Sequence, residues 1–493
     1  MKHLKLITVF LTVAGLFGCG GGGGGDDFAA SPPPPASPPP PPTGGIGRTG
    51  LAVGPVSNFG SIIVNGVKYE TDSADFIVND DVGSQDDLSV GDVVLVKGTI
   101  NDDGTTGTAD EVLYDDAVTG PVTSIDPAGS SLVVLGQTVR VGPDTSFDDS
   151  FTPASLEGVN VDQIVEVTGQ FDANGAIVAT RLEPKPAGTQ FEVHGNVASL
   201  DDVNFRFSLG DLVVDYSNAM LEDFAGGQIA NGDFVEAKGT SLDAAGRLEA
   251  TSVELETLLP GAVEGDRIEL DGFITRFVSA EDFDVAGQPV TTTTGTVYEG
   301  GVAADLGLNI KVEVEGDFDA NGVLVAEEVD IRRAKAVRAV ATIDSVNAAS
   351  NSFVLLDITV TVDALTRIED KSDARVEPLT VADLAAGDYV EVRGDEFPAG
   401  SGGILATILE RDDPDTDTIL QGFVETAGAS SLSILGVTVD TGAGTIFRDE
   451  NDAVISSAEF FGRLTAGDLV KAKGLESSDA SITAEEVEFE LEF

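Results

Sequence analysis

The sequence predicts an all-β fold, built as a tandem array of six small β-barrel modules. The intervals between the recurrent glycines described below run from 70 residues (169 to 239) to 80 residues (394 to 474). That length exceeds a solenoid repeat and suits a small self-contained domain. Within each interval, valine-rich runs bounded by glycine and aspartate are typical of short strands. The repeat is marked by a short apolar strand that ends in Gly98, Gly169, Gly239, Gly316, Gly394 and Gly474.

The second repeat gives the order of elements within one module. A segment that contains Leu156 separates the third strand from the fourth and predicts a short helical or irregular crossing. Three strands, a crossing and two further strands are the order of an OB-type barrel. A small β-sandwich is the alternative, but it needs seven or more strands. The five expected strands cover residues 118–125, 131–135, 138–141, 164–167 and 176–182.

Three further motifs recur in this order around the strands. A Thr-x-apolar step follows the third strand, a Gly-Asp pair such as Gly91-Asp92 precedes the fourth, and an alanine such as Ala109 opens the last. Modules two and four have Val161-Asp162 and Leu308-Asn309 where the others have Gly-Asp. Because the motifs keep their order in each repeat, we expect all six modules to share one fold.

By these recurrent glycines and motifs, the chain resembles the bacterial domain-of-unknown-function 5666 family, which is repeated in lipoproteins. The resemblance covers about residues 51–493, and it implies a fold but no activity and no catalytic residue. The predicted modules span residues 50–116, 117–187, 188–260, 261–334, 335–414 and 415–493.

The first residues combine a basic start with a short apolar stretch. Lys2 and Lys5 precede residues 6–17, which are too few to cross a bilayer of about 30 Å as a helix. The stretch ends at Leu16-Phe17-Gly18-Cys19, which resembles the bacterial lipoprotein cleavage box. This resemblance implies that residues 1–18 are a signal peptide and that Cys19 carries a covalent lipid. An ordinary signal peptide is the alternative.

Residues 19–49 are rich in glycine and proline, which predicts a disordered tether that holds the modules away from a membrane. Proline runs favour the stiff polyproline II conformation and glycine runs provide a flexible joint. The residue after Cys19 is Gly20 and not aspartate. By the sorting rule known for enteric lipoproteins, this favours the outer membrane.

The composition is strongly acidic. The chain has 85 Asp and Glu residues against 27 Lys and Arg residues, a formal charge of −58. Such a surface repels nucleic acid phosphates and favours cations or simple solubility. The only cysteine is Cys19, so no disulfide framework or thiolate metal site is expected, and the histidines are His3 and His194.

Two identical hairpin sequences alternate oxygen-bearing side chains. Asp172 and Asn174 precede Gly175, and the same sequence places Asp319 and Asn321 before a second glycine. Calcium binding by these four residues is one hypothesis, although the glycine lies too early for an EF-hand loop. The alternative is a plain turn, since Asp, Asn and Gly all suit turn dihedrals. The sequence predicts no other metal ligand.

Two other features are interpreted as structural. The position of His194 holds Thr119, Asp271 or Gln421 in other modules, which predicts a solvent-facing slot. The basic cluster that begins at Arg332 lies between modules four and five. It is either a linker or a docking element that pairs with acids of a neighbouring module.

These observations predict a non-enzymatic, lipid-anchored protein of the bacterial cell envelope, at the outer membrane and facing the periplasm or the surface. Its expected role is binding, adhesion or spacing. The expected partners are the membrane, through the lipid, and an envelope or extracellular ligand, but no nucleic acid. No cofactor is expected apart from the lipid on Cys19. The alternatives are a calcium- or other cation-binding module array and a hydrolase that uses carboxylates alone.

Overall fold

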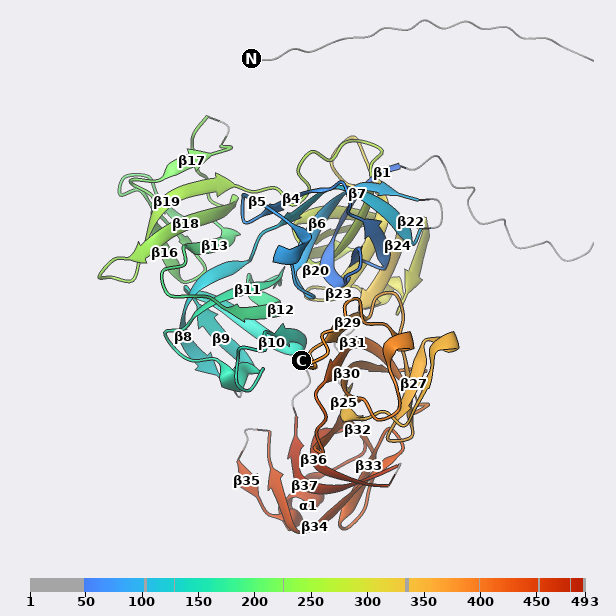
Figure 1. Cartoon of the computed structure of the whole chain (residues 1–493). Coiled ribbons are helices and arrows are strands. Elements are labelled where there is room, and N and C mark those ends of the chain that lie inside the picture. The colour runs from blue at the N-terminus through green and yellow to red at the C-terminus, as the bar shows by residue number, and fades with distance from the viewer. Residues whose placement is uncertain are drawn as a thin grey trace, which may run out of the picture. The chain divides into compact units, whose positions relative to one another are not determined.

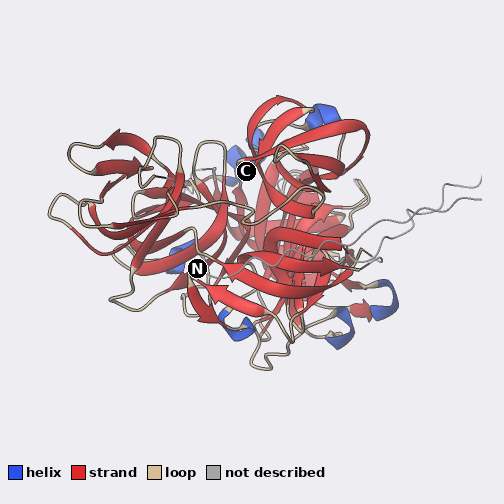
Figure 2. Cartoon of the chain, turned by 90° about the horizontal axis from the view of Figure 1, so that it is seen from above, coloured by secondary structure: helices blue, strands red, loops and turns tan. Residues whose placement is uncertain are grey.

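The structure, a computed structural model, describes residues 48–490 apart from 102–103, 128, 225, 333–336, 399, 451–452 and 479. Strands form nearly all of the regular structure (Figure 2). The described residues contain one α-helix, α1 (Ser457–Arg463), and five 3-10 helices of three residues each. No helix in these residues is long and apolar enough to cross a membrane. The all-β prediction is confirmed. Cys19, the signal peptide and the tether up to residue 47 lie outside the described residues.

The second repeat shows the architecture of one module. Its first strand pairs with the second, the second with the third, and the third runs parallel to the fifth. The fifth strand pairs with the fourth, which returns to the first and closes a five-stranded barrel of the OB type. The 3-10 turn Leu156–Gly158 occupies the predicted crossing. The strands are β8 (Val118–Asp126), β9 (Ser131–Val134), β10 (Gln137–Phe147), β11 (Ile164–Phe171) and β12 (Ile177–Pro184).

The same closed ring recurs in modules 1, 4 and 6, with small additions (Figure 1). The strands of module 1 are β1 (Arg48–Asn58), β2 (Ile62–Val64), β3 (Val67–Glu70), β4 (Asp75–Val78), β5 (Asp81–Gly83), β6 (Val93–Ile100) and β7 (Thr106–Tyr114). Those of module 4 are β20 (Arg267–Ser279), β21 (Asp282–Val285), β22 (Gln288–Glu299), β23 (Lys311–Phe318) and β24 (Leu324–Arg332). Those of module 6 are β32 (Thr418–Ala427), β33 (Ser431–Ile434), β34 (Val437–Arg448), β35 (Val454–Ile455), β36 (Leu469–Ser478) and β37 (Ser481–Phe489).

In modules 3 and 5 the first strand is split into two pieces. The first piece pairs with the fourth strand of the barrel and the second piece pairs with the second strand. The strands of module 3 are β13 (Phe191–Asn196), β14 (Ala198–Asp201), β15 (Arg206–Leu209), β16 (Leu212–Asp215), β17 (Met220–Glu222), β18 (Phe234–Leu242) and β19 (Leu248–Leu255). Those of module 5 are β25 (Val337–Thr342), β26 (Ser345–Asn347), β27 (Ser352–Leu355), β28 (Ile358–Thr361), β29 (Arg367–Asp370), β30 (Tyr389–Glu396) and β31 (Ile404–Asp412).

The glycine that marks each repeat lies at a β-bulge between the last two long strands. In all six modules the pairing register shifts immediately before this glycine. A Cβ atom on Gly394 would lie 2.0 Å from the carbonyl oxygen of Leu405, and the corresponding distances in the other modules run from 2.1 to 2.7 Å. The residue opposite is the recurrent alanine, such as Ala406. The tag is therefore glycine because only glycine tolerates this approach of two backbones.

The recurrent threonine bridges a gap between the third and fifth strands. Regular pairing stops between Val141 and Ser146 in module 2, and Thr145 lies in this gap. Its hydroxyl donates to the carbonyl oxygen of Ala179 at 2.7 Å. The same bond, at 2.7 or 2.8 Å, joins threonine to the alanine carbonyl in modules 4, 5 and 6. The hydroxyl thus replaces a backbone donor where the strand bends.

The Gly-Asp pair forms a tight turn into the fourth strand. Gly91 has a φ of +98°, and the Asp92 carboxylate accepts from the amide of Ser89 at 2.7 Å. In modules 2 and 4, Asp162 and Asn309 occupy the glycine position themselves, with φ of +68° and +64°. The alignment of Val161-Asp162 and Leu308-Asn309 with Gly-Asp is therefore wrong by one residue. Asp and Asn replace glycine there because they tolerate positive φ.

The modules join in pairs through their first strands, and one of the three pairs links modules that are not neighbours in the chain (Figure 1). β1 runs parallel to β20, which links modules 1 and 4. β8 and β13 link modules 2 and 3, and β25 and β32 link modules 5 and 6. The apolar cores are continuous across the last two junctions. Each pair of modules thus shares one sheet.

Candidate functional site

The slot that includes His194 is buried in every module, so the prediction that it faces solvent is wrong. It lies on the first strand, and the neighbouring module covers the outer face of that strand. The variety of residues at this position indicated solvent exposure, because the sequence of one barrel carries no signal of a second barrel against it. The six slot residues are 2–8% exposed: Val53, Thr119, His194, Asp271, Val340 and Gln421.

Around His194, polar residues gather on the outer face of module 3. His194 on β13 lies opposite Glu236 on β18, which lies opposite Glu254 on β19. On the same strands, Val193 and Val235 are fully buried inside the barrel. Three adjacent strands therefore present three titratable side chains on one face. We call the His194 cluster the group formed by Asp80, Glu192, His194, Glu236, Lys238, Glu254 and Glu256.

Module 1 covers this face with the turn between β4 and β5. Asp80 in that turn accepts from the ammonium of Lys238 at 2.5 Å, and Lys238 also lies 3.0 Å from the Glu236 carboxylate. Lys238 is the one cation in the cluster, and it faces five carboxylates. This excess of acidic groups over basic groups is the main electrostatic feature of the site.

The His194 side chain lies in this cluster without full hydrogen bonding. The side chain is 9% exposed, and its Nδ1 is buried with no hydrogen-bond partner. Its Nε2 lies 3.8 Å from Glu236 Oε1, beyond hydrogen-bond distance. Burial, reinforced by the Lys238 ammonium, lowers the pKa of His194 to about 4. The imidazole is therefore neutral at pH 7.

Three carboxyl groups of the cluster have raised pKa values. Burial raises the pKa of Glu236 to about 8 despite the attraction of Lys238. Burial, together with neighbouring acids, also raises the pKa of Glu192 and that of Glu256 to about 7. A single lysine does not offset the desolvation of so many acids.

These shifts predict that stability falls as the pH rises from about 5 to about 8. Each folded-state pKa lies above the ordinary value of 4.5, so the folded chain holds protons that the unfolded chain releases. The stability present in acid is lost as the pH passes through about 7 to 8. Glu236→Gln should remove about 3 kcal/mol of this loss. Thermal unfolding in chelator across this pH range measures it, and equal pH slopes for variant and wild type would contradict the assignment.

The first predicted cation hairpin is ordered by its own aspartate. Asp172 Oδ1 accepts from the amides of Asn174 at 2.7 Å and Ala176 at 2.9 Å, and Asp172 is 4% exposed. The hairpin also reaches module 4, where Asn309 Oδ1 accepts from the Ala173 amide at 2.7 Å.

The second hairpin has the same turn. Asp319 Oδ1 accepts from the amides of Asn321 at 2.8 Å and Val323 at 2.9 Å, and Asn321 Nδ2 donates to Asp319 Oδ2 at 3.1 Å. The turn thus accounts for the Oδ1 atoms of both aspartates without an ion, while Asp172 Oδ2 is buried without a hydrogen-bond partner. Calcium binding by these four residues stays a prediction.

A second group of charges joins module 2 to modules 1 and 5. The Arg181 side chain is 6% exposed and lies 2.7 Å from Glu183, 3.4 Å from Asp148 and 3.9 Å from Glu369 of module 5. It also donates to the Val90 carbonyl of module 1 at 3.4 Å. Arg181 therefore lies where three modules meet.

The basic residues at the junction of modules 4 and 5 pair within their own modules. Arg332 binds Glu313 and Asp330 of module 4, and Arg338 binds Glu391 of module 5. Docking through these two arginines is therefore wrong, while the rest of the cluster, residues 333–336, lies outside the described residues.

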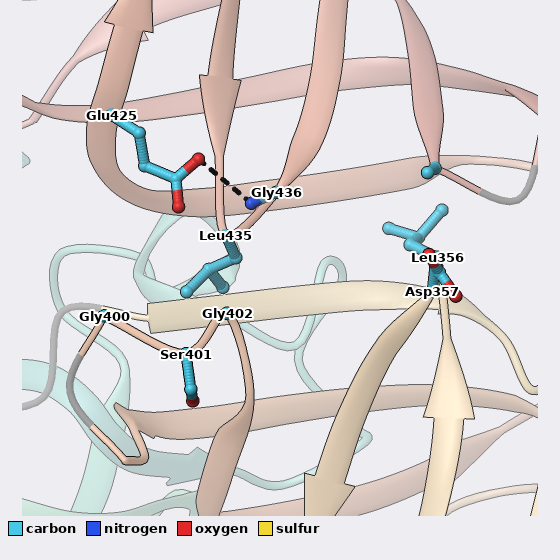
Figure 3. A pocket seen from close by; sticks show the side chains of 9 residues that line it. Leu356, Asp357, Gly400, Ser401, Gly402, Glu425, Leu435 and Gly436 are labelled. Carbon is cyan, nitrogen blue, oxygen red and sulfur yellow. Dashed lines mark hydrogen bonds between the residues drawn. The ribbon is translucent and has the colours of Figure 1, made fainter.

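A cavity of about 270 Å³ lies between turns of modules 5 and 6 (Figure 3). It is lined mainly by the turns at Leu356-Asp357 and Leu435-Gly436 and by residues 400–402. The Glu425 carboxylate points to Gly436, whose amide donates to it at 3.1 Å. Since this carboxylate is used within its own module, the His194 cluster is the stronger candidate site.

Comparison with known proteins identifies the repeat. A family model described as "Domain of unknown function (DUF5666)" matches six segments of the chain. No curated protein matches the chain. A solved structure described as "drosophila Unr CSD456" is 15% identical over 44% of this chain and 98% of that chain, with a TM-score of 0.12. The fold assignment rests on the strand order above. The six matched segments are residues 53–112, 119–183, 194–254, 271–330, 340–409 and 421–488.

Proposed function

Because the chain belongs to the DUF5666 family through six tandem copies of its domain, we propose that it is a non-enzymatic, lipid-anchored scaffold of the bacterial cell envelope. Cys19 carries the lipid, and the Gly/Pro-rich tether holds the modules away from the outer membrane. The modules then act in binding, adhesion or spacing.

The observation that carries this proposal is the use of the variable polar positions. At the slot of the first strand, where the modules carry Val, Thr, His, Asp or Gln, four of the six side chains are polar and all six are buried. Gln170 of module 2 donates to Asp271 of module 4 at 2.7 Å, and Arg393 of module 5 donates to the Thr145 carbonyl of module 2 at 2.8 Å. Sequence divergence between the repeats thus supports assembly, as in a scaffold.

The charge of the chain supports a partner other than nucleic acid. With a formal charge of −58, phosphate backbones are repelled at long range. The ligand expected for such a scaffold is another component of the envelope or of the cell's surroundings. The experiment for this part is capture of partners on the purified wild-type chain at two ionic strengths.

The lipid anchor gives a direct prediction. Cys19→Ala removes the thiol that accepts the lipid, so the variant should leave the membrane fraction almost completely, while the wild type stays there until detergent is added. Mass spectrometry of the mature N-terminus measures the lipid, and cell fractionation measures the location. A Cys19→Ala variant that still sediments with membranes would contradict anchoring through this residue.

A further inference from the structure

We propose that His194, Glu236 and Glu256 form a binding site for one divalent transition-metal ion of the zinc class. The site lies on the outer face of module 3 that module 1 covers. This inference goes beyond the proposed function and does not depend on the lipid anchor.

The ligand atoms are already gathered. One nitrogen of His194 and one carboxylate oxygen from each of Glu236 and Glu256 all lie within 4.8 Å of one another. In a tetrahedral zinc site, ligand atoms at about 2.0–2.2 Å from the metal are roughly 3.3 Å apart. His194 and Glu236 come from paired strands, so their backbones stay in place. Rotation of the side chains alone would therefore have to bring the ligand atoms from within 4.8 Å to about 3.3 Å of one another.

The buried, incompletely bonded imidazole is an independent indication of a ligand. A buried polar atom without a partner carries a desolvation cost, so native proteins rarely retain one. His194 Nδ1 is such an atom, and Nε2 faces the Glu236 carboxylate without a hydrogen bond. A cation bound through Nε2, the nitrogen that faces Glu236, would give the imidazole one of the two partners that it lacks.

The charge of the surroundings favours a dication. A second trio, Asp80, Glu236 and Glu254, also has carboxylate oxygens within 4.8 Å of one another and shares Glu236 with the first. The ammonium of Lys238 lies between Asp80 and Glu236. If a metal bound His194 and Glu236, the Glu236 carboxylate would no longer pair with Lys238, and the Lys238 ammonium would pair with Asp80 alone. Glu254 or water would supply a fourth ligand.

The ligand set selects the class of metal. Calcium and magnesium take oxygen ligands, whereas imidazole suits zinc and other late transition metals. One nitrogen and two carboxylates therefore favour zinc over calcium. This site also differs from the calcium hairpins expected from the sequence, since it contains none of their residues.

The test is calorimetric titration of the full chain, purified with its anchor in detergent, with Zn²⁺ and separately with Ca²⁺. We expect one Zn²⁺ per chain, because the ligand atoms of His194, Glu236 and Glu256 are gathered at one place. His194→Gln copies the residue of module 6 at the same slot, Gln421. It should weaken Zn²⁺ binding by about 100-fold, and Glu236→Gln should do the same.

Glu313→Gln is the matched control. Glu313 holds the position of Glu236 in module 4, three residues before the recurrent glycine, but binds Arg332. This variant should bind Zn²⁺ as the wild type does. A wild-type chain without Zn²⁺ binding, ligand variants with unchanged affinity, or Ca²⁺ binding as tight as Zn²⁺ would each overturn the proposal.

A spectroscopic measurement on the wild type keeps the proposal testable if a variant fails to fold. The chain has two histidines, His3 and His194, so ¹⁵N-histidine labelling gives an imidazole spectrum that is simple to assign. Zn²⁺ at one equivalent should shift the ring nitrogens of His194, while Ca²⁺ should not. An unchanged His194 spectrum at saturating Zn²⁺ would refute metal binding by this imidazole.

Discussion

Gly394→Ala should destabilise module 5 by about 3 kcal/mol or abolish its folding. The new Cβ would lie 2.0 Å from the Leu405 carbonyl oxygen and 2.9 Å from its carbon. Both are backbone atoms of the paired strand β31, so no side-chain rotation relieves the clash. The strand pair must separate, and the bulge that bends β30 into the barrel would be lost.

Gly442→Ala is the control for this prediction. Gly442 also lies in a strand, β34, but a Cβ there would meet no atom within 4 Å, and its φ is not positive. Its replacement should leave the thermal midpoint within about 1 °C, since exposed substitutions of this kind cost little. Circular dichroism melts of both variants measure the difference. Equal midpoints for the two alanine variants would refute the steric explanation of the repeat tag.

Arg181→Met should cost about 3–5 kcal/mol, because it removes one partner of a buried charge group and leaves the others unpaired. Methionine keeps most of the volume of the arginine stem, so the variant tests charge and hydrogen bonding. Glu183, Asp148 and Glu369 would lose their shared cation. Since Glu369 belongs to module 5, modules 2 and 5 should also be held together less tightly.

Arg276→Met provides the contrast. Arg276 binds Asp282 and Asp284 within module 4, and its side chain is 44% exposed. Exposed ion pairs contribute about 0–1 kcal/mol, so this variant should melt almost as the wild type does. Calorimetry of both variants at one pH makes the comparison. Similar losses for the two variants would mean that the Arg181 junction is not a structural contact of the folded chain.

The interior of each module could be predicted from the sequence because its signals are local and repeated. Glycine at the bulge, alanine opposite it and threonine in the gap occur at fixed positions, and each has a backbone reason. Because the pattern occurs six times, the shared order of its motifs is not a coincidence. The one misalignment, at Asp162 and Asn309, arose because Asp and Asn substitute for glycine at positive φ.

The candidate metal site could not be predicted because it depends on how modules meet. His194 and Glu236 lie at outward positions of their strands, where polar residues are expected in a solitary barrel, and Glu256 follows the end of β19. The turn of module 1 that covers them contains Asp80, which is 158 residues away from its partner Lys238 in the chain. Pairing of module 1 with module 4, across two intervening modules, leaves no periodic signal in the sequence.

The central claim is that the repeats form one assembly in which modules distant in the chain touch. Asp144 of module 2 and Thr407 of module 5 test it directly, since the Thr407 hydroxyl donates to the Asp144 carboxylate at 3.2 Å. The two residues are replaced by cysteine in a Cys19→Ala chain, which has no other thiol. After treatment with a short thiol-specific cross-linker and proteolysis, mass spectrometry should find residues 144 and 407 joined within one chain, while neither single variant gives this link. If both thiols remain free in the folded double variant, this account is contradicted, and the modules form a row without contacts between distant repeats.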